Sequence, residues 1–267
     1  MGRTVLVLLT NDDGIYAPGL AAMERELEKM ADVYVVAPAT EQSGVGHSIT
    51  YLSPLVVKEL FEGRQRRGWA VEGSPADCVK IGIFEFCPRL PDLVVSGING
   101  GLNAGINVLY SGTVAAAIEG AFYGITSVAV SLEFSEHAQV DRAAALARQV
   151  IEQILAHKET GPQLYNLNIP IAALEPGARE LRVVPMGLAR SGEQYEKRVD
   201  PRGRSYFWAL SDPVGHTGEH ETDISALRKG FVTLTPLDFD LTKRSFVAEM
   251  EHWQFDLVNP TGARSNP

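Results

Sequence analysis

The sequence has few of the features that suit an oxidising compartment or a membrane. Among 267 residues there are two cysteines, Cys78 and Cys87, and they form neither a CxxC motif nor a disulfide framework. No apolar run approaches the roughly 20 residues that a membrane span needs. The amino-terminal residues also reach Asp12 too early for a signal peptide. We therefore expect buried free thiols, a cytoplasmic location and no membrane partner.

Positive charge is scarce as well. Lys and Arg total 24 against 33 Asp and Glu, which gives a formal net charge of −9. A surface of this sign repels nucleic-acid backbones, so we expect no nucleic-acid polymer as a partner. A small anionic ligand is still compatible with this composition, because the local charge of a site, above all a bound metal, outweighs the total.

The dinucleotide-binding fingerprint GxGxxG is also missing. Glycines are frequent between residues 97 and 112, but their spacing differs from that motif, and no such motif follows the first strand. This argues against a nicotinamide-dependent enzyme. Glycines in such a loop do allow its backbone to approach a ligand closely.

Strand and helix patterns alternate through the first 170 residues. Ser74, with Pro75 after it and Asp77 three residues on, is typical of a capping box at the start of a helix. Alternation of this kind predicts a mainly parallel, doubly wound α/β sheet. The strand patterns cover residues 4–10, 32–38, 92–97, 126–132 and 163–169, and the helical patterns cover 17–31, 73–86, 113–124 and 138–156.

The composition changes after Pro170. Residues 187–228 are polar and offer few core positions, before one more strand pattern at 231–242 and a short helical pattern at 243–253. A long polar excursion with scattered aromatic residues is often an arm that packs on another subunit. We therefore predict a catalytic core over residues 1–170 and a C-terminal, β-rich oligomerisation arm over residues 171–267, with a soft boundary.

Oxygen-bearing side chains follow three of the predicted strands. The first strand ends at Asp12 and Asp13, the second leads into a loop with Ser43, and the third leads to Asn99. Ligands of doubly wound sheets bind at the carboxyl ends of the strands, so we expect these side chains to meet. Carboxylate, hydroxyl and amide oxygens suit a hard divalent cation such as Mg²⁺, Mn²⁺ or Ca²⁺. By itself, the sequence NDDG is also good turn chemistry that needs no metal.

A second motif suits an anion. Ser111, Gly112 and Thr113 stand where a loop becomes a helix, so free backbone N–H groups and the helix dipole favour a phosphate there. Simple capping by Ser111 or Thr113 is the alternative. A metal beside a phosphate indicates phosphoryl chemistry, with a metal-activated water as the attacking group. Asn103, Ser111 and Thr113 would then hold the non-bridging oxygens.

Several stretches together resemble one known family, the SurE family (survival protein E), the stationary-phase survival nucleotidases. The matching stretches are TNDDGIYAPG, EQSGVGHSIT, EGSPADCVKIGI and VSGINGGLNAGINVLYSGTVAAAIEG, in the family's order, followed near the C-terminus by ETDISALRKGFVTLTPLDFDLT. Ser74 stands where threonine is usual. Asn107 stands where many members carry an acid, so that position is assigned no role.

The resemblance implies a fold, an activity and a set of site residues. The implied fold is a Rossmann-like core whose subunits join through C-terminal arms as a homodimer or homotetramer. The implied activity is that of a 5'/3'-nucleotidase, which releases phosphate from nucleoside monophosphates with one divalent cation, Mg²⁺ or Mn²⁺, per subunit. The family's metal ligands fall on Asp12, Asp13, Ser43 and Asn99, its phosphate contacts fall on Asn103, Ser111, Gly112 and Thr113, and the expected catalytic residues are Asp12, Asp13, Asn103 and Ser111.

Two other readings of the acidic pair remain open on the sequence. A phosphatase that forms an aspartyl-phosphate could use Asp13 as its nucleophile, but it would want a lysine and further acids at later strand ends. A receiver-type signalling domain, or another non-catalytic nucleotide-binding protein, is the second reading. A receiver needs a phospho-accepting aspartate at the end of the third strand, where this chain has Ser96 and Asn99.

Overall fold

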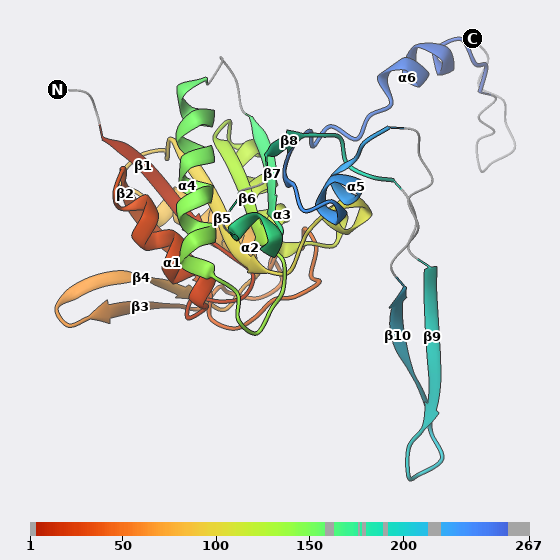
Figure 1. Cartoon of the computed structure of the whole chain (residues 1–267), viewed down its shortest axis with the longest axis horizontal. Coiled ribbons are helices and arrows are strands. Elements are labelled where there is room, and N and C mark those ends of the chain that lie inside the picture. The colour runs from red at the N-terminus through yellow and green to blue at the C-terminus, as the bar shows by residue number, and fades with distance from the viewer. Residues whose placement is uncertain are drawn as a thin grey trace, which may run out of the picture. The chain divides into compact units, whose positions relative to one another are not determined.

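The computed structural model describes residues 4–157, 163–175, 177, 180–188, 192–212 and 220–255 (Figure 1). The chain divides into two compact units, Met1–Leu237 and Asp238–Pro267. The described part of the second unit contains one helix, α6 (Arg244–Met250). The division near residue 170 into a catalytic core and an oligomerisation segment stays a prediction.

A nine-stranded sheet runs through the described part of the first unit. Its strands are β1 (Val5–Thr10), β2 (Ala31–Pro38), β3 (Val57–Glu62), β4 (Gln65–Val71), β5 (Leu93–Gly100), β6 (Thr126–Leu132), β7 (Leu164–Ile169), β8 (Leu181–Val183) and β11 (Val232–Leu237). Their order is β3-β4-β2-β1-β5-β6-β7-β11-β8. Every neighbouring pair is parallel except β3 with β4 and β7 with β11. The predicted mainly parallel, doubly wound α/β fold is confirmed.

Helices cover both faces of this sheet. Val7 and Leu9 of β1 belong to the core cluster that includes α1 (Pro18–Leu27) and α4 (Val140–Ala156). Leu8, between them, belongs to the cluster that includes α2 (Pro75–Ile81) and α3 (Gly112–Phe122). Figure 1 shows α1 and α4 together on one side of the sheet. Because neither face of β1 meets water, its sequence is a continuous apolar run rather than an alternating one.

Several features were predicted correctly from short stretches of sequence. Ser74 caps α2, and its hydroxyl accepts a hydrogen bond from the N–H of Asp77, whose carboxylate accepts one in return from the N–H of Ser74. Both cysteines are free: Cys78 is buried and Cys87 is half-buried. Desolvation raises the pKa of the Cys87 thiol to about 12, so this thiol is protonated at neutral pH.

Two hairpins were not predicted from the sequence. The first joins β3 to β4 and adds them to the sheet beside β2. The second pairs β9 (Gly192–Val199) with β10 (Ser205–Asp212) in a separate two-stranded sheet. This second hairpin falls within the polar segment expected to form an arm, and its antiparallel strands fit the β-rich arm. The described side chains of β3, β9 and β10 are largely exposed, so neither hairpin shows the alternation that marks two strands with one buried face.

A single carboxylate joins three segments of the first unit. Asp223, at the start of α5 (Asp223–Arg228), is fully buried. Its oxygens accept hydrogen bonds from the N–H groups of Gly105 at 2.7 Å, of Gly187 at 2.8 Å and of Ile224 at 2.7 Å. The loop after β5, the segment after β8 and the start of α5 therefore depend on one side chain.

We expect Asp223→Ala to destabilise the protein severely. It would leave three backbone N–H groups without their acceptors, and each unsatisfied donor costs roughly 1–3 kcal/mol, so a loss of about 3–5 kcal/mol is expected. Urea denaturation followed by circular dichroism measures this loss. Asp141→Ala is the control, because Asp141 is an exposed partner of Arg25 and such pairs are worth about 0–1 kcal/mol. Equal, small losses in the two variants would contradict the assigned role of Asp223.

Candidate active site

The predicted site residues lie where the order of the strands reverses. The chain winds outward from β1 through β2 and β4 in one direction and from β5 through β6 and β7 in the other. The crevice between the carboxyl ends of β1 and β5 is therefore the topological switch point, the usual ligand site of this kind of sheet. Asp12 and Asp13 follow β1, and Asn99 lies at the end of β5.

A tight turn holds the two aspartates at this edge. The amide of Asn11 donates to the carbonyl oxygen of Gly14 at 2.9 Å and accepts from its N–H at 3.2 Å. Gly14 has a φ of +98°, a conformation that side chains disfavour. The turn reading of NDDG is thus correct for Asn11 and Gly14, which leaves the two carboxylates between them available for another role.

Asp12 is buried against the amino end of α3. Its side chain accepts a 2.5 Å hydrogen bond from the hydroxyl of Thr113. A Cβ on Gly112 would lie 2.9 Å from the Cβ of Asp12, so only glycine allows the helix to approach this closely. Burial raises the pKa of Asp12 from 3.8 to about 6; the Thr113 hydrogen bond works against this increase and the nearby Asp13 charge adds to it.

Asp13 lies beside Asp12 and faces β5. Its carboxylate accepts from the N–H of Gly100 at 3.1 Å. Burial raises the pKa of Asp13, the Gly100 hydrogen bond partly offsets that effect, and the charge of Glu41 adds to it. Neither aspartate has an ion pair with a cationic side chain in the described part of the chain. Glu41 adds a third negative charge beside Asp13. Sequence reasoning did not select this residue.

The two expected neutral metal ligands differ in their placement. The side-chain N–H₂ of Asn99 donates to the carbonyl oxygen of Gly101 at 2.7 Å. This leaves the amide oxygen of Asn99 available as a ligand. Ser43 is exposed, and its hydroxyl donates to Glu41 at 2.5 Å rather than to either aspartate. The loop that carries it is nevertheless tied to the site, because the N–H of Gln42 donates to the backbone carbonyl of Asp12 at 2.7 Å.

Asn103 is held by a network that reaches across two more strands. Its side chain donates to Ser131 on β6 at 3.0 Å and, at a longer 3.4 Å, to Thr113. Its backbone N–H donates to Asn168 at 2.8 Å, and its carbonyl oxygen accepts from Asn166 at 2.7 Å and Asn168 at 3.1 Å. Sequence reasoning missed these β7 asparagines, although two buried amides in an apolar strand were a signal of a polar partner.

The loop-to-helix junction at residues 111–113 combines a capped helix start with one free N–H group, whereas the Thr113 hydroxyl is already donated to Asp12. Ser111 caps α3, because its hydroxyl oxygen accepts from the N–H of Val114 at 3.1 Å. Its hydroxyl proton remains available to a ligand. The N–H of Gly112, at the first helical position, has no acceptor among the described residues. An anion at this point would also meet the positive end of the helix dipole.

A cavity of about 430 Å³ adjoins the aspartates. Asp13, Glu41 and Asn99 form its polar end, and the rest is mostly apolar, from the start of α1 and the segment after β6, with Glu133 and Ser135 as the polar exceptions. Phe134 lies on that segment and is 73% exposed, so its ring is accessible to a ligand in the cavity. The cavity thus places an aromatic surface next to a polar one, which suits a ligand with a ring and a charged group.

The residues present fit a hard divalent cation. Two partly buried carboxylates stand side by side without a cationic partner, and like charges in that position oppose ionisation until a cation joins them. The neighbouring free oxygen is an amide oxygen. No group of three or more His, Cys, Asp or Glu side chains suited to a metal gathers in the described residues, so neutral oxygens and water would have to complete the shell, as is usual for Mg²⁺.

Comparisons with known proteins agree with this geometry. The sequence model described as "Survival protein SurE" matches residues 7–193. A protein named 5'-nucleotidase SurE from Rhodopirellula baltica is 59% identical over 92% of this chain and 98% of its own length. Another of the same name, from Heliobacterium modesticaldum, is 44% identical over 92% and 91%, respectively. The crystal structure of SurE protein from Aquifex aeolicus superposes with a TM-score of 0.80 at 33% identity, and covers 92% of this chain and 98% of that one.

We expect Asp12→Asn to stabilise the metal-free protein at neutral pH. The pKa of Asp12 in the folded protein is near 6, above the ordinary 3.8. The folded state therefore loses stability as the pH rises from 3.8 to about 6, and the whole loss is present above that range. At pH 7.5 the variant should gain up to about 3 kcal/mol, and at pH 5 roughly half of that. Denaturation with a chelator present, at both pH values, measures the gain. A gain of the same size at both pH values would mean that ionisation of Asp12 is not its cause.

Proposed function

The chain belongs to the SurE family, and from that membership we propose that it is a 5'-nucleotidase that uses a divalent metal to release phosphate from nucleoside monophosphates. One observation carries the proposal beyond the family's name. The carboxylates of Asp12 and Asp13, without a cationic partner among the described residues, share one edge of the sheet with the amino end of α3. A cation and a phosphate can therefore be held side by side.

Asp12 and Asp13 would hold the cation, Mg²⁺ or Mn²⁺, one per subunit. Asn99 would add its amide oxygen, and Ser43 would exchange its hydrogen bond to Glu41 for the same role. When bound, the cation would supply a water of lowered pKa and would offset the negative charge of the phosphate. Thr113 keeps Asp12 in place through its hydroxyl, so the ligand oxygen is positioned before a cation arrives.

The phosphate would lie at the start of α3. The N–H of Gly112 and the hydroxyl proton of Ser111 are available to its oxygens, and the helix dipole favours the negative charge. The amide of Asn103 already donates at 3.0 Å to Ser131. Its longer contact with Thr113 is the one that a phosphate oxygen can replace. These donors are fixed in advance by a cap and by the Asn166 and Asn168 network, as stabilisation of transition-state charge requires.

We assign the nucleoside to the 430 Å³ cavity beside Asp13. Its volume lies within the range of small-molecule sites. Phe134 offers a ring against which a base can stack, and Glu133, which also lines the cavity, accepts a hydrogen bond from the N–H of Ile171 at 2.8 Å and so is held in place.

The β9–β10 hairpin supports the proposal of a homodimer or homotetramer. Tyr206, Phe207 and Trp208 of β10 are 42%, 59% and 58% exposed. Three large aromatic side chains exposed in succession on a two-stranded sheet are more typical of an interface than of a free surface. The described helices include none that is long and apolar enough to cross a membrane. The cytoplasmic location stays a prediction.

The two other readings of the acidic pair receive less support. The described lining of the cavity next to Asp13 includes no lysine, which an aspartyl-phosphate enzyme would want. A receiver-type domain would need an aspartate at the end of β5, and Ser96 at that strand is buried in the sheet. A hydrolase with a metal-activated water needs carboxylate ligands and donors for a phosphate, which the two aspartates and the start of α3 would supply.

The direct test is phosphate release from a panel of nucleoside monophosphates with Mn²⁺, with Mg²⁺ and with a chelator. We expect turnover that disappears on chelation and returns with metal. Asp13→Asn should reduce it by about 100-fold or more, because it removes one of two charged ligands. Asp141→Asn, an exposed acid elsewhere, should leave turnover unchanged. Turnover that persists in the chelator or in Asp13→Asn would exclude the proposed metal role.

We expect Phe134→Ala to raise KM for a nucleoside monophosphate by about 3- to 10-fold, which corresponds to the loss of one aromatic stacking contact. The value of kcat should change little, because the ring contacts the nucleoside and not the phosphate. Steady-state kinetics give both constants. Phe84→Ala is the matched control, since Phe84 is 65% exposed and does not line this cavity. An unchanged KM in Phe134→Ala would move the nucleoside elsewhere.

A further inference from the structure

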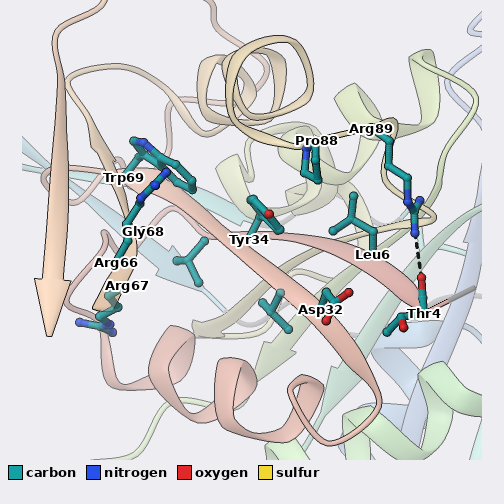
Figure 2. A pocket seen from close by; sticks show the side chains of 12 residues that line it. Thr4, Leu6, Asp32, Tyr34, Arg66, Arg67, Gly68, Trp69, Pro88 and Arg89 are labelled. Carbon is teal, nitrogen blue, oxygen red and sulfur yellow. Dashed lines mark hydrogen bonds between the residues drawn. The ribbon is translucent and has the colours of Figure 1, made fainter. Parts of the chain in front are cut away.

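A second, larger cavity lies away from the candidate active site. Its volume is about 620 Å³, and it opens between the first half of β2 and the start of β4 (Figure 2). Thr4 and Leu6, at the beginning of β1, line its far end. Leu6 lies four residues before the end of β1 at Thr10, a distance of about 13 Å along the strand, and Asp12 follows that end. The two cavities therefore lie at opposite ends of the strands, the second at the amino ends and the first at the carboxyl ends.

This second cavity exists because β4 meets β2 only from Trp69 onward. The parallel register pairs Val36 with Trp69, and the residues of β4 before Trp69 have no partner on β2. Gly68 lies at the point of divergence: a Cβ there would come within 2.5 Å of the carbonyl oxygen of Val35. Arg66 and Arg67 precede this glycine and line one rim of the cavity.

Arg66 is the cationic group of the cavity that is still free to bind an anion. Its guanidinium lies over the ring of Trp69, 4.9 Å from the centroid, and makes no ion pair within the described residues. The other two arginines of the lining are already engaged: Arg67 with Glu24 at 3.5 Å, and Arg89 with Asp92 at 2.7 Å and with the Thr4 carbonyl at 2.8 Å. An unpaired guanidinium held on an aromatic ring is a typical element of phosphate recognition.

The centre of the cavity is aromatic and its lower rim is acidic. Tyr34 lies in the middle of the floor (Figure 2), nearly parallel to Trp69 with 6.1 Å between the ring centroids. Trp69 stacks in turn on Phe86 at 4.5 Å, which makes it part of a rigid wall. Asp32 lies on β2 two residues before Tyr34, is exposed, and makes no ion pair in the described part of the chain.

We propose that this cavity is a second ligand site, distinct from the active site, for a mononucleotide such as AMP. The phosphate would pair with Arg66, the base or sugar would lie against Tyr34, and Asp32 would accept hydrogen bonds from sugar hydroxyls or an exocyclic amine. The presence of all three groups in one cavity indicates the class of ligand. Inorganic phosphate would use Arg66 alone, a nucleoside would use Tyr34 and Asp32 alone, and a mononucleotide uses all three.

The proposal is tested with a signal that is local to the cavity. The chain has three tryptophans, Trp69, Trp208 and Trp253. Replacing Trp208 and Trp253 by phenylalanine leaves Trp69, which lines the cavity, as the only indole. Titration of this full-length protein with AMP, in a chelator that prevents turnover, should change its fluorescence in a saturable way. Phosphate alone and adenosine alone should each bind at least about tenfold more weakly, because each lacks one set of contacts.

Two charge-matched variants separate a specific site from general attraction of anions. Arg66→Ala should weaken AMP binding by about tenfold or more. Arg64→Ala, in the turn between β3 and β4, removes the same charge two residues away but lies outside the lining, and should bind like the parent. Asp13→Asn should leave the Trp69 response intact, which shows that it does not report the active site. Equilibrium dialysis of AMP gives the stoichiometry independently of fluorescence.

The proposal fails if AMP leaves Trp69 unaffected and dialysis finds no site that Arg66→Ala removes. It also fails if Arg64→Ala weakens binding as much as Arg66→Ala, which would indicate general electrostatic attraction. Binding of phosphate as tight as that of AMP would overturn the assignment of a nucleotide. None of these measurements uses turnover, so their results are independent of the proposed nucleotidase activity.

Discussion

The arrangement of the site follows from the burial of Asp12 at the topological switch point. A carboxylate there loses hydration, and in the described residues no cationic side chain restores what it loses. The neighbouring structure adapts to it: Asn11 closes the turn, Thr113 donates to one carboxylate oxygen, and Gly112 omits a side chain so that α3 can approach. The amino end of a helix is thereby brought against a carboxylate, so a negative side chain adjoins the partial positive charge of the helix dipole. Such a site costs folding stability that a purely structural turn would not.

The parts of this arrangement that depend on residues close together in the sequence could be predicted, and the parts that depend on distant residues could not. The strand ends at Asp12, Asp13 and Asn99 were predictable because an apolar run stops at polar residues, and the sheet topology brings such ends together. The cap at Ser111 was predictable from the loop-to-helix transition. The side chain of Ser43 was placed in the correct loop, but its hydrogen bond to Glu41 depends on the path of that loop and leaves no mark in the sequence.

Long-range contacts escaped prediction for a physical reason. The asparagines of β7 contact Asn103 across 63 and 65 positions of sequence, and Asp223 contacts Gly105 across 118. No periodicity or capping rule links residues that far apart. The β3–β4 hairpin was missed because the side chains of β3 and of the first residues of β4 are largely exposed and charged. Those first residues of β4 diverge from β2, which opens the cavity around Tyr34 and Arg66. Features at the edges of the sheet were therefore harder to predict than its centre, where burial on both faces imposes one pattern on the sequence.

The position of β11 has a consequence for how this protein is made. The strand lies between β7 and β8, antiparallel to the one and parallel to the other, although it comes more than 45 residues after β8 begins. A nascent chain leaves the ribosome from its amino end, and domains generally fold as units during synthesis. Until β11 and Asp223 have emerged, β7 has an open edge and the N–H of Gly105 lacks its acceptor, although β6 and β7 already hold Asn103. A product truncated before Asp223 would therefore carry the two aspartates and the asparagine network, but it would lack the side chain that holds Gly105 and Gly187 together.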